Sequence, residues 1–342
     1  MELAAAIARA CARQDLGADE MAAAVGRIMD GEATAAQIGA LLVALRMKGE
    51  TVDEVVGAAT AMRARATRLR VPAGVVVDTC GTGGDGRGTI NVSTIAALVV
   101  AAAGVRVAKH GNRAQSSRSG SADVLEALGV DVSAPVAVVE RCLDEVGIGF
   151  LYAPAFHGAT RHVAAARKEI GVRTIFNLLG PLTNPAGACH QLIGVYDAGL
   201  VEPMAHALGR LGSEHALVVH GDGLDEFSPN GATEVAELRA FGGGAVEVKR
   251  YQLRPRDFAL DDEDPAGLDG GEAQANAEAV RAILGGARGA GRSAVVMSAA
   301  GAFYAANKSG LRDGARLAEA TIDSGAAAAL LDRLIACSRR RP

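Results

Sequence analysis

The sequence predicts an α/β protein with two parts: a small N-terminal all-helical domain, and a larger α/β domain whose central, largely parallel sheet is flanked by helices. Helical periodicity fills the first 70 or so residues, whereas short β-branched runs alternate with helical segments from about residue 74. Polar, glycine-rich loops follow those runs. A chain of 342 residues is long enough for about two domains. We therefore assign residues 1–70 and 71–342, and leave open whether later helices near 160–185 join the first domain.

Two capping boxes mark helix starts in the first part. Thr34 with Gln37, and Thr51 with Glu54, each place a hydroxyl at the N-cap and a Gln or Glu at the third helical position. After the first box, apolar residues recur on one helical face, at Ile38, Leu41, Leu42 and Leu45. No polar cluster converges in this stretch. We expect its apolar faces to pack on each other or on another subunit.

Three strand-and-loop units follow. The strands are expected at residues 75–78, 105–108 and 216–219, with helices at 90–104 and 122–128, and a helical tail closes the chain. Ligands of such sheets bind outside the carboxyl ends of the strands. All three polar loops follow strands at that edge, so we expect them to form one site.

Composition excludes several classes of protein. The formal net charge is −4 and aromatic residues make up 3%, which argues against a dedicated nucleic-acid binder. Five cysteines, an odd number with no CxxC pair, indicate neither a disulfide framework nor a zinc ribbon. The longest apolar run, residues 95–105, is too short to cross a bilayer. We expect a cytoplasmic protein that binds no membrane.

The first polar loop favours phosphate binding. Glycines stand at positions 81, 83, 84, 86 and 88, between a strand and a helix, where backbone amides and a helix N-terminus bind anions. A tight turn is the alternative, but it needs fewer glycines. Asn91, Ser93 and Thr94 then open the helix. Each alone is an ordinary N-cap, yet together they offer hydroxyls and amides to a polyanion, and a Ser hydroxyl there could reach Mg²⁺.

The second and third loops add charge. Lys109, His110 and Arg113 are followed by serines up to Ser121, a set that suits an anion with many oxygens. Asp225 and Glu226, in the third loop, could serve as a general acid and base, as metal ligands, or as a solvated turn. A polyphosphate usually arrives with Mg²⁺ held by one or two carboxylates, which favours metal ligands. No nucleophile stands out, so we expect catalysis by positioning and charge.

Several long motifs resemble those of the anthranilate phosphoribosyltransferase family. They are Asp78-Thr-Cys-Gly-Thr-Gly-Gly-Asp85, Asn91-Val-Ser-Thr94, Lys109-His-Gly-Asn-Arg113, Ser119-Gly-Ser-Ala-Asp-Val-Leu-Glu-Ala-Leu128, Arg173-Thr-Ile-Phe-Asn-Leu-Leu-Gly-Pro-Leu-Thr-Asn-Pro185 and Val219-His-Gly-Asp-Gly-Leu-Asp-Glu226. The resemblance runs from about Ala23 to Leu334. It implies transfer of phosphoribose from phosphoribosyl pyrophosphate (PRPP) to the amino group of anthranilate, in tryptophan biosynthesis. It also implies a homodimer formed through the helical domain.

The resemblance also implies roles for individual residues. One or two Mg²⁺ ions would be bound by Ser93, Asp225 and Glu226. Anthranilate would be bound by Gly81, Asn112 and Arg167, and the Arg167 guanidinium independently suits a carboxylate. PRPP would be bound by Gly81, Gly84, Asp85, Thr89, Asn91, Val92, Ser93, Thr94, Lys109, His110, Gly111, Asn112, Arg113, Ala114, Gln115, Ser116, Ser117 and Ser121.

Three positions depart from the expected family pattern. Gly158 and Ala165 stand where Pro is frequent, near the proposed anthranilate channel, and Ser298 stands where Asn is frequent, with no assigned role. Two other readings remain open at this point. A pyrimidine nucleoside phosphorylase, a relative in fold, would bind phosphate and a nucleoside without Mg²⁺. A non-enzymatic, nucleic-acid-binding relative would show a basic excess and damaged motifs.

Overall fold

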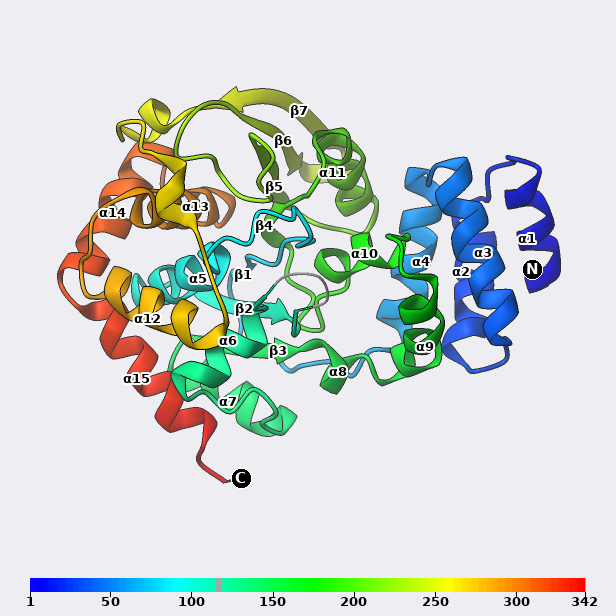
Figure 1. The fold of residues 1–342 in the computed structure, drawn as a ribbon, viewed down its shortest axis with the longest axis horizontal. Helices are drawn as coiled ribbons and strands as arrows, with labels where there is room; N and C mark the ends of the chain where they lie inside the picture. The colour runs from blue at the N-terminus through cyan, green and yellow to red at the C-terminus, as the bar shows by residue number, and fades with distance from the viewer. Residues whose placement is uncertain (115–117, 342) are drawn as a thin grey trace.

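The N-terminal helices form a separate lobe at one end of the molecule (Figure 1). The computed structural model describes residues 1–114 and 118–341. The lobe contains α1 (Leu3–Cys11), α2 (Ala18–Met29), α3 (Ala35–Lys48) and α4 (Val52–Arg65). Both predicted capping boxes are present: the Thr34 hydroxyl accepts a hydrogen bond from the Gln37 amide, and the Thr51 hydroxyl accepts one from the Glu54 amide. These local signals were sufficient to place both helix starts.

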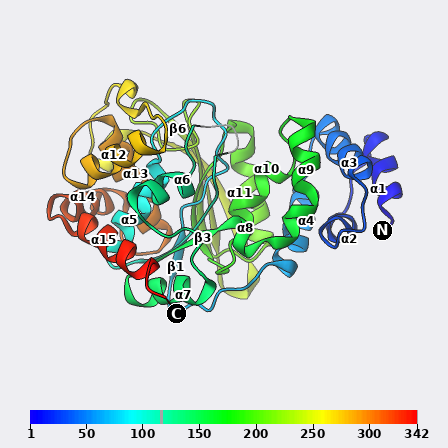
Figure 2. The same ribbon diagram turned by 60° about the horizontal axis from the view of Figure 1, so that its bottom comes forward.

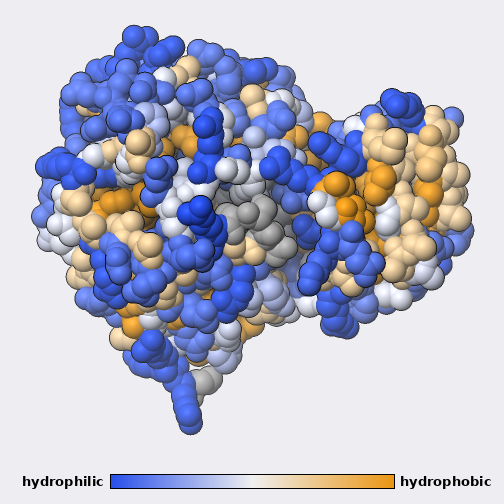
Figure 3. Space-filling model, viewed as in Figure 1, coloured by the Kyte–Doolittle hydropathy of each residue, from blue (hydrophilic) through white to orange (hydrophobic). Residues whose placement is uncertain are grey.

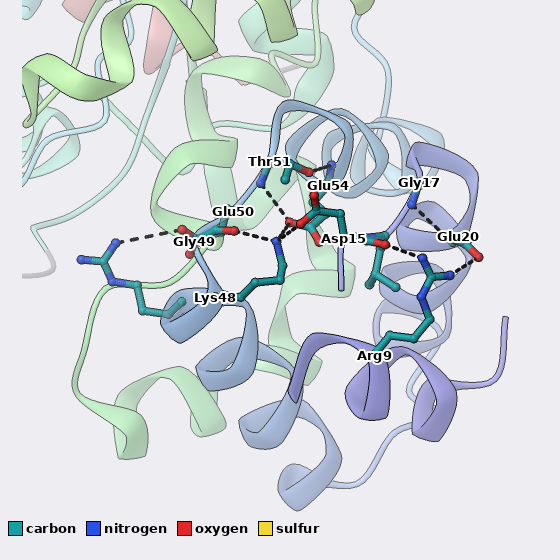
Figure 4. Close-up of polar contacts among 11 residues, drawn as sticks. Arg9, Asp15, Gly17, Glu20, Lys48, Gly49, Glu50, Thr51 and Glu54 are labelled. Atoms are coloured by element: carbon teal, nitrogen blue, oxygen red, sulfur yellow. Dashed lines mark hydrogen bonds and ion pairs between the residues drawn. The ribbon is translucent and has the colours of Figure 1, made fainter. Parts of the chain in front are cut away.

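A charged cluster ties the loops of this lobe together (Figure 4). The side chain of Glu54 is fully buried, and its Oε2 lies 3.1 Å from Lys48 Nζ. Its Oε1 accepts a hydrogen bond of 3.0 Å from the Leu16 amide, and Lys48 Nζ also lies 2.7 Å from an oxygen of Asp15. The α1–α2 loop is thereby joined to the α3–α4 loop.

The larger part is built on a seven-stranded sheet with the order β3-β2-β1-β4-β5-β6-β7. The first five strands in that order are parallel, and β6 and β7 are antiparallel to their neighbours. The fold class predicted from the sequence is therefore confirmed. The strands are β1 (Val76–Asp78), β2 (Arg106–Gly111), β3 (Ile148–Tyr152), β4 (His190–Gly194), β5 (His215–Gly221), β6 (Thr233–Ala240) and β7 (Val246–Leu253).

Helices cover both faces of the sheet (Figures 1 and 2). One face carries α5 (Val92–Ala102), α6 (Ser121–Leu128), α7 (Val136–Glu145), α12 (Ala273–Leu284), α13 (Ala290–Ala305), α14 (Leu311–Asp323) and α15 (Ala326–Ser338). The other carries α11 (Val201–Arg210) and α10 (Phe176–Leu179). Alternate strand residues feed the two sides: Leu217 and Val219 enter the first core, and Ala216 and Val218 enter the second. The predicted helix over 90–104 is shorter than expected, at Val92–Ala102.

The second core continues into the N-terminal lobe. It joins apolar residues of α1 to α4 with residues 163–182 and with one face of β4, β5 and β6. The helix α9 (Arg161–Ile170) packs against α3 and α2, and α10 packs against α4 (Figure 2). Short elements complete the connection, namely α8 (Ala153–Phe156), η1 (Gly158–Thr160) and η2 (Gly180–Leu182). Further single turns of 3₁₀ helix lie at Ala198–Leu200, Gly242–Gly244, Pro255–Phe258 and Pro265–Leu268. Within the described residues, no helix is both long and apolar enough to cross a membrane.

Candidate functional site

The three polar loops meet at the carboxyl edge of the parallel strands. The strand order reverses between β1 and β4, and such a reversal opens a crevice at that edge. The glycine loop after β1 lies against the end of β4, where the Thr82 amide donates to the Gly194 carbonyl at 2.8 Å. A Cβ on Gly81 would lie 2.9 Å from that carbonyl and 3.5 Å from Asp225 Oδ2. Glycine at 81 is therefore required by close packing of the first loop on the end of β4.

The glycine loop is held from two sides. Gly84 has φ +83°, a left-handed conformation that glycine adopts without strain. Its carbonyl accepts a hydrogen bond from Arg173, whose guanidinium carbon lies 4.3 Å from the centre of the Tyr196 ring. Beyond it, Thr89 pairs with Asp269, and the Gly270 amide donates to the Gly88 carbonyl at 2.8 Å. The loop is thus a shaped backbone cradle, with Arg173 as a neighbour that the sequence analysis did not assign.

The start of α5 supplies the groups expected for an anion, with one correction. Asn91 is the N-cap, but its side chain makes no capping bond. Its Nδ2 donates instead to the Ser119 carbonyl at 3.2 Å, and its Oδ1 accepts from Asn276 Nδ2 at 2.9 Å. Val92 is buried in the core and can offer only backbone. The Thr94 hydroxyl is buried and has no hydrogen-bond partner among the described residues.

Lys109 lies beneath this helix end. Its side chain is buried, and Nζ lies 3.3 Å from both oxygens of Thr79 and 3.4 Å from Ser93 Oγ. The Asp78 carboxylate at the end of β1 is fully buried and accepts a 2.7 Å bond from Asn184 Nδ2. Burial raises the pKa of Asp78 to about 6, although Lys109 and the hydrogen bonds oppose the rise. Lys109 thus lies between strand-end oxygens and the helix N-terminus.

Three carboxylates converge opposite Lys109. The Asp225 amide lies 3.4 Å from Asp85 Oδ2, and Glu226 Oε1 accepts a 3.0 Å bond from the Ser93 amide. Burial, followed by the charges of Glu226 and Asp85, raises the pKa of Asp225 well above its ordinary value. Burial likewise raises the pKa of Glu226 to about 7. Within the part of the chain that the structure describes, no group of three His, Cys, Asp or Glu side chains could hold a metal ion by itself. A cation bound here would therefore take some of its ligands from a substrate.

The second loop is only partly described. Gln115, Ser116 and Ser117 lie outside the described residues. A Cβ on Gly111 would meet Ser121 Oγ at 2.2 Å, so β2 packs directly on the start of α6. The Arg113 guanidinium binds Glu126 Oε2 at 2.8 Å and Asp123 Oδ1 at 3.0 Å. Its donors are therefore directed toward α6.

The remaining residues of the second loop show different surroundings. Asn112 is exposed, and its Oδ1 accepts a hydrogen bond of 2.8 Å from the Arg113 amide. Ala114 donates its amide to Asp123 Oδ2 at 2.9 Å. His110 is buried, and its Nδ1 lies 2.9 Å from the Gly180 carbonyl. Burial, with a smaller contribution from the neighbouring His157, lowers the pKa of His110 to about 3. His110 is therefore neutral at physiological pH.

Arg167 lies apart from the loops, on α9. It is half-buried, and its guanidinium carbon lies 5.5 Å from the centre of the Phe176 ring. Burial lowers the pKa of this guanidinium. No carboxylate in the described residues forms an ion pair with it. Gly158 begins η1 and Ala165 is exposed on α9.

Two residues that support the site came from remote segments. Ser298, left without a role by the sequence, lies on α13 and donates to Glu226 Oε2 at 3.2 Å. Asn276, on α12, orients the Asn91 amide. The site is separate from a cavity found elsewhere in the described residues. That cavity, of about 850 Å³, lies at the opposite sheet edge, where Arg106, Gly147 and Asn307 are among its lining residues.

Comparisons with known proteins agree with this arrangement. The model of the glycosyl transferase family α/β domain matches residues 73–328, and that of the family's helical bundle domain matches residues 4–66. An anthranilate phosphoribosyltransferase from Anaeromyxobacter sp. strain K is 56% identical over 334 residues, which cover 97% of this chain and 98% of that protein. One from Myxococcus xanthus is 54% identical over 337 residues, covering 98% of each chain.

Solved structures show the same relationship. The anthranilate phosphoribosyltransferase of Thermus thermophilus superposes with a TM-score of 0.91, at 46% identity, over 98% of this chain and 99% of that one. The Saccharomyces cerevisiae enzyme, in complex with PRPP and Mg, superposes with a TM-score of 0.88 at 27% identity, over 98% and 97% of the two chains. This chain belongs to the anthranilate phosphoribosyltransferase family.

Proposed function

We propose that this protein transfers the phosphoribosyl group of PRPP to the amino group of anthranilate, giving N-(5-phosphoribosyl)anthranilate and pyrophosphate in tryptophan biosynthesis. The observation that carries the proposal is the sheet-edge site, where a glycine cradle, a helix N-terminus and a buried ammonium face three partly buried carboxylates. Full-length relatives at 54–56% identity bear the name of this activity.

The glycine loop and the start of α5 are the proposed pyrophosphate-binding elements. The backbone of the glycine loop and the dipole at the start of α5 favour an anion. Lys109 adds a buried positive charge beside Ser93. We propose that the residues assigned to PRPP binding from the sequence have that role, and the structure changes how two of them would act. Val92 would act through its backbone, and Asn91 through a side chain already fixed by Ser119 and Asn276.

Mg²⁺ fits the donors at this edge, and we propose one or two ions. Asp225 and Glu226 offer carboxylate oxygens, Ser93 offers a hydroxyl, and hard cations prefer such ligands. Burial raises the pKa of both carboxyls, and a bound cation would oppose that rise by favouring their ionised forms. The ion, when bound with PRPP, would stabilise the negative charge that develops on the departing pyrophosphate.

The protein's own contribution is positioning and charge. The amides of the glycine loop and Lys109 hold the pyrophosphate while positive charge builds on the ribose at C1. The amine of anthranilate is already a free base at neutral pH, so the attack on C1 needs no strong general base. Holding both reactants in line converts a bimolecular step into a unimolecular one. Arg167, half-buried and without a carboxylate partner among the described residues, would bind the anthranilate carboxylate with its paired donors.

A direct assay tests the proposal. When purified protein is mixed with PRPP, Mg²⁺ and anthranilate, the fluorescence of anthranilate should decrease as anthranilate is consumed. Addition of EDTA should prevent this decrease. A parallel reaction with a pyrimidine nucleoside and inorganic phosphate distinguishes the phosphorylase alternative. Phosphorolysis of the nucleoside without metal, together with stable anthranilate fluorescence, would overturn the proposal.

Arg167 allows a residue-level test of acceptor binding. A hydrogen bond to a charged group contributes roughly 1.5–3 kcal/mol, so Arg167→Ala should raise the KM for anthranilate about ten- to hundred-fold. The KM for PRPP should stay nearly constant. Arg167→Lys should restore binding only in part, because an ammonium keeps the charge and loses the fork. If wild type and Arg167→Ala have equal KM values for anthranilate, Arg167 does not bind the acceptor and has only a structural role.

The homodimer is a further proposal. Figure 3 shows apolar surface gathered over the helical lobe. On α3, Val43 is 37% exposed and Met47 is 71% exposed, and large exposed apolar side chains in a cluster favour an interface. We propose that residues 1–70 carry this interface, with α9 packed beside them. Met47→Glu should shift the protein toward a monomer in sedimentation analysis.

The proposed location is the cytoplasm. All five cysteines are free thiols, as expected in a reducing compartment. We propose no nucleic acid and no membrane as partners, and PRPP and anthranilate as the small-molecule substrates. The proposed domain boundary near residue 70 falls between α4 and β1.

A further inference from the structure

The carboxylate of Glu226 is held by the protein on both of its oxygens. Oε1 accepts a hydrogen bond of 3.0 Å from the Ser93 amide, in the first turn of α5. Oε2 accepts one of 3.2 Å from the Ser298 hydroxyl on α13. The two donors come from different helices, so the orientation of the carboxylate depends on both.

Ser298 is an unusual residue for its place in the fold. The residue is fully buried, and its neighbours on α13 are apolar, including Val295, Met297 and Ala299. A serine inside a helix commonly bonds back to the carbonyl one turn earlier. The hydroxyl of Ser298 instead donates across to the third loop, to Glu226. The hydroxyl at this position therefore forms its hydrogen bond with the third loop and not within α13.

The two bonds have a geometric consequence. A carboxylate offers about four lone-pair positions, and the two donors occupy one on each oxygen. Rotation of the carboxylate about its terminal bond would break both hydrogen bonds. The remaining lone pairs are therefore held in fixed directions. Groups that orient a metal-binding carboxylate in this way commonly change metal affinity about 10- to 100-fold when they are removed.

We propose that Ser298 is a positioning residue that fixes the plane of the Glu226 carboxylate for binding of the metal–PRPP complex. This inference rests on the proposed function, because it takes Glu226 as a metal ligand. Ser298 would touch neither PRPP nor anthranilate. Its loss should weaken metal binding while leaving acceptor binding and the fold largely unchanged.

The test measures metal binding directly. Mn²⁺ replaces Mg²⁺, and the signal of free Mn²⁺ in electron paramagnetic resonance is followed during titration of the protein with saturating PRPP. Ser298→Ala should raise the dissociation constant for Mn²⁺ about 10- to 100-fold. The KM for anthranilate should change less than about two-fold, because acceptor contacts remain.

Ser213→Ala is the matched control. Ser213 is also buried, and its hydroxyl donates to a side-chain oxygen, Gln191 Oε1, at the same 3.2 Å. This pair lies at the start of β4 and β5, away from the three loops. Ser213→Ala should lose comparable thermal stability and keep the Mn²⁺ affinity of the wild type. Thermal melting of both variants measures the general cost of removing a buried hydroxyl.

Each outcome decides the proposal. A Mn²⁺ affinity of Ser298→Ala within about two-fold of wild type, or an equal loss in both variants, overturns the positioning role. If the wild-type protein consumes anthranilate but binds no Mn²⁺ in the presence of PRPP, Glu226 is not a metal ligand and this inference is wrong. The proposed transferase activity is then unaffected. If Ser298→Ala does not fold, Ser298→Cys keeps a similar volume with a weak donor. It should weaken Mn²⁺ binding several-fold, and wild-type affinity would overturn the proposal.

Discussion

Two clusters of charged side chains in this protein differ in how completely the protein neutralises them. In the helical-domain cluster (Asp15, Lys48 and Glu54), the ammonium lies within 3.1 Å of both carboxylates, and two backbone amides donate to Glu54. In the sheet-edge cluster (Asp85, Lys109, Asp225 and Glu226), three carboxylates face one ammonium. No carboxylate in the described residues lies within ion-pair distance of Lys109.

The difference separates a structural cluster from a binding site. In the helical-domain cluster, both carboxylates lie within ion-pair distance of Lys48 and Glu54 also accepts two backbone hydrogen bonds, so the group stabilises the fold. At the sheet edge, uncompensated carboxylates retain raised pKa values, and such perturbation is common at functional sites. Substitutions should therefore affect stability in one cluster and activity in the other.

The largest expected effect is on stability, in the helical-domain cluster. Glu54→Gln removes one partner of a buried ion pair, which typically costs about 3–5 kcal/mol. The free energy of unfolding, measured by urea denaturation, should fall accordingly. The value of kcat per folded molecule should stay constant. Asp15→Asn, at the exposed end of the same cluster, is the control and should cost less than about 1 kcal/mol. Equal losses for the two variants would contradict the comparison.

The second effect is a pH dependence of opposite sign to the usual one. The pKa of Glu226 is raised from 4.5 to about 7, so the folded protein keeps a proton that the unfolded chain has lost. Stability of the metal-free protein should therefore decrease as pH rises from about 4.5 to about 7, by about 1.4 kcal/mol for each unit of pKa difference that remains after solvent screening. Glu226→Gln should reduce this slope in thermal melts, and an unchanged slope would contradict it.

Glu237 provides a contrast for that measurement. Although burial opposes the shift, hydrogen bonds from His215, Tyr251 and Arg239 lower the pKa of Glu237 to about 2. Its contribution to stability is present above about pH 4.5 and is lost as pH falls toward 2. The Glu237→Gln variant should therefore lose stability at neutral pH and should keep the decline between pH 4.5 and 7 that belongs to Glu226.

The third effect is on catalysis, at the sheet edge. The double variant Asp225→Asn with Glu226→Gln should reduce kcat/KM by on the order of a hundred-fold, as expected for loss of several kcal/mol of metal-assisted stabilisation. Because the substituted groups repel each other in the wild type, thermal stability should stay equal or rise. The residual activity should depend less on Mg²⁺. Full activity of the double variant in EDTA would remove the metal role.

The smallest expected effect concerns the glycine loop. Arg173 donates to the Gly84 carbonyl and stacks on Tyr196. Arg173→Ala should loosen the loop and raise the KM for PRPP about ten-fold, which corresponds to the roughly 1.5 kcal/mol of a weak charge-assisted bond. The KM for anthranilate should not change. A change in the KM for anthranilate alone would show that Arg173 contributes to acceptor binding and not to the conformation of the glycine loop.

Local signals made much of this molecule predictable from sequence. The capping boxes at Thr34 and Thr51 and the strand-then-loop pattern each depend on residues close together in the chain, and the structure contains all of them. Among the described strands, β3, β4, β6 and β7 were missed. The edge strand β7 is largely exposed, and β4 opens with His190 and Gln191, which are buried through hydrogen bonds. Neither gives a continuous apolar run.

The supporting residues of the site were beyond the reach of local patterns. Ser298 is 72 residues from Glu226, Asn276 is 185 from Asn91, and Arg173 is 89 from Gly84. Nothing in the neighbouring sequence of each indicates its partner, because the contact is created by the packing of helices against the sheet. The motifs indicated which loops lie together at the sheet edge, whereas the groups that orient those loops became visible only in the fold.

The second core also sets an order of events during synthesis of the chain. It joins residues 3–62 to residues 163–238, so the ribosome releases the first four helices before their partners exist. At roughly 5–20 residues per second, the intervening stretch of about 100 residues takes about 5–20 s to translate. During that interval the apolar side of the lobe has only itself or a chaperone to cover it. The N-terminal lobe, although first to be made, is then completed only when the middle of the protein folds back onto it.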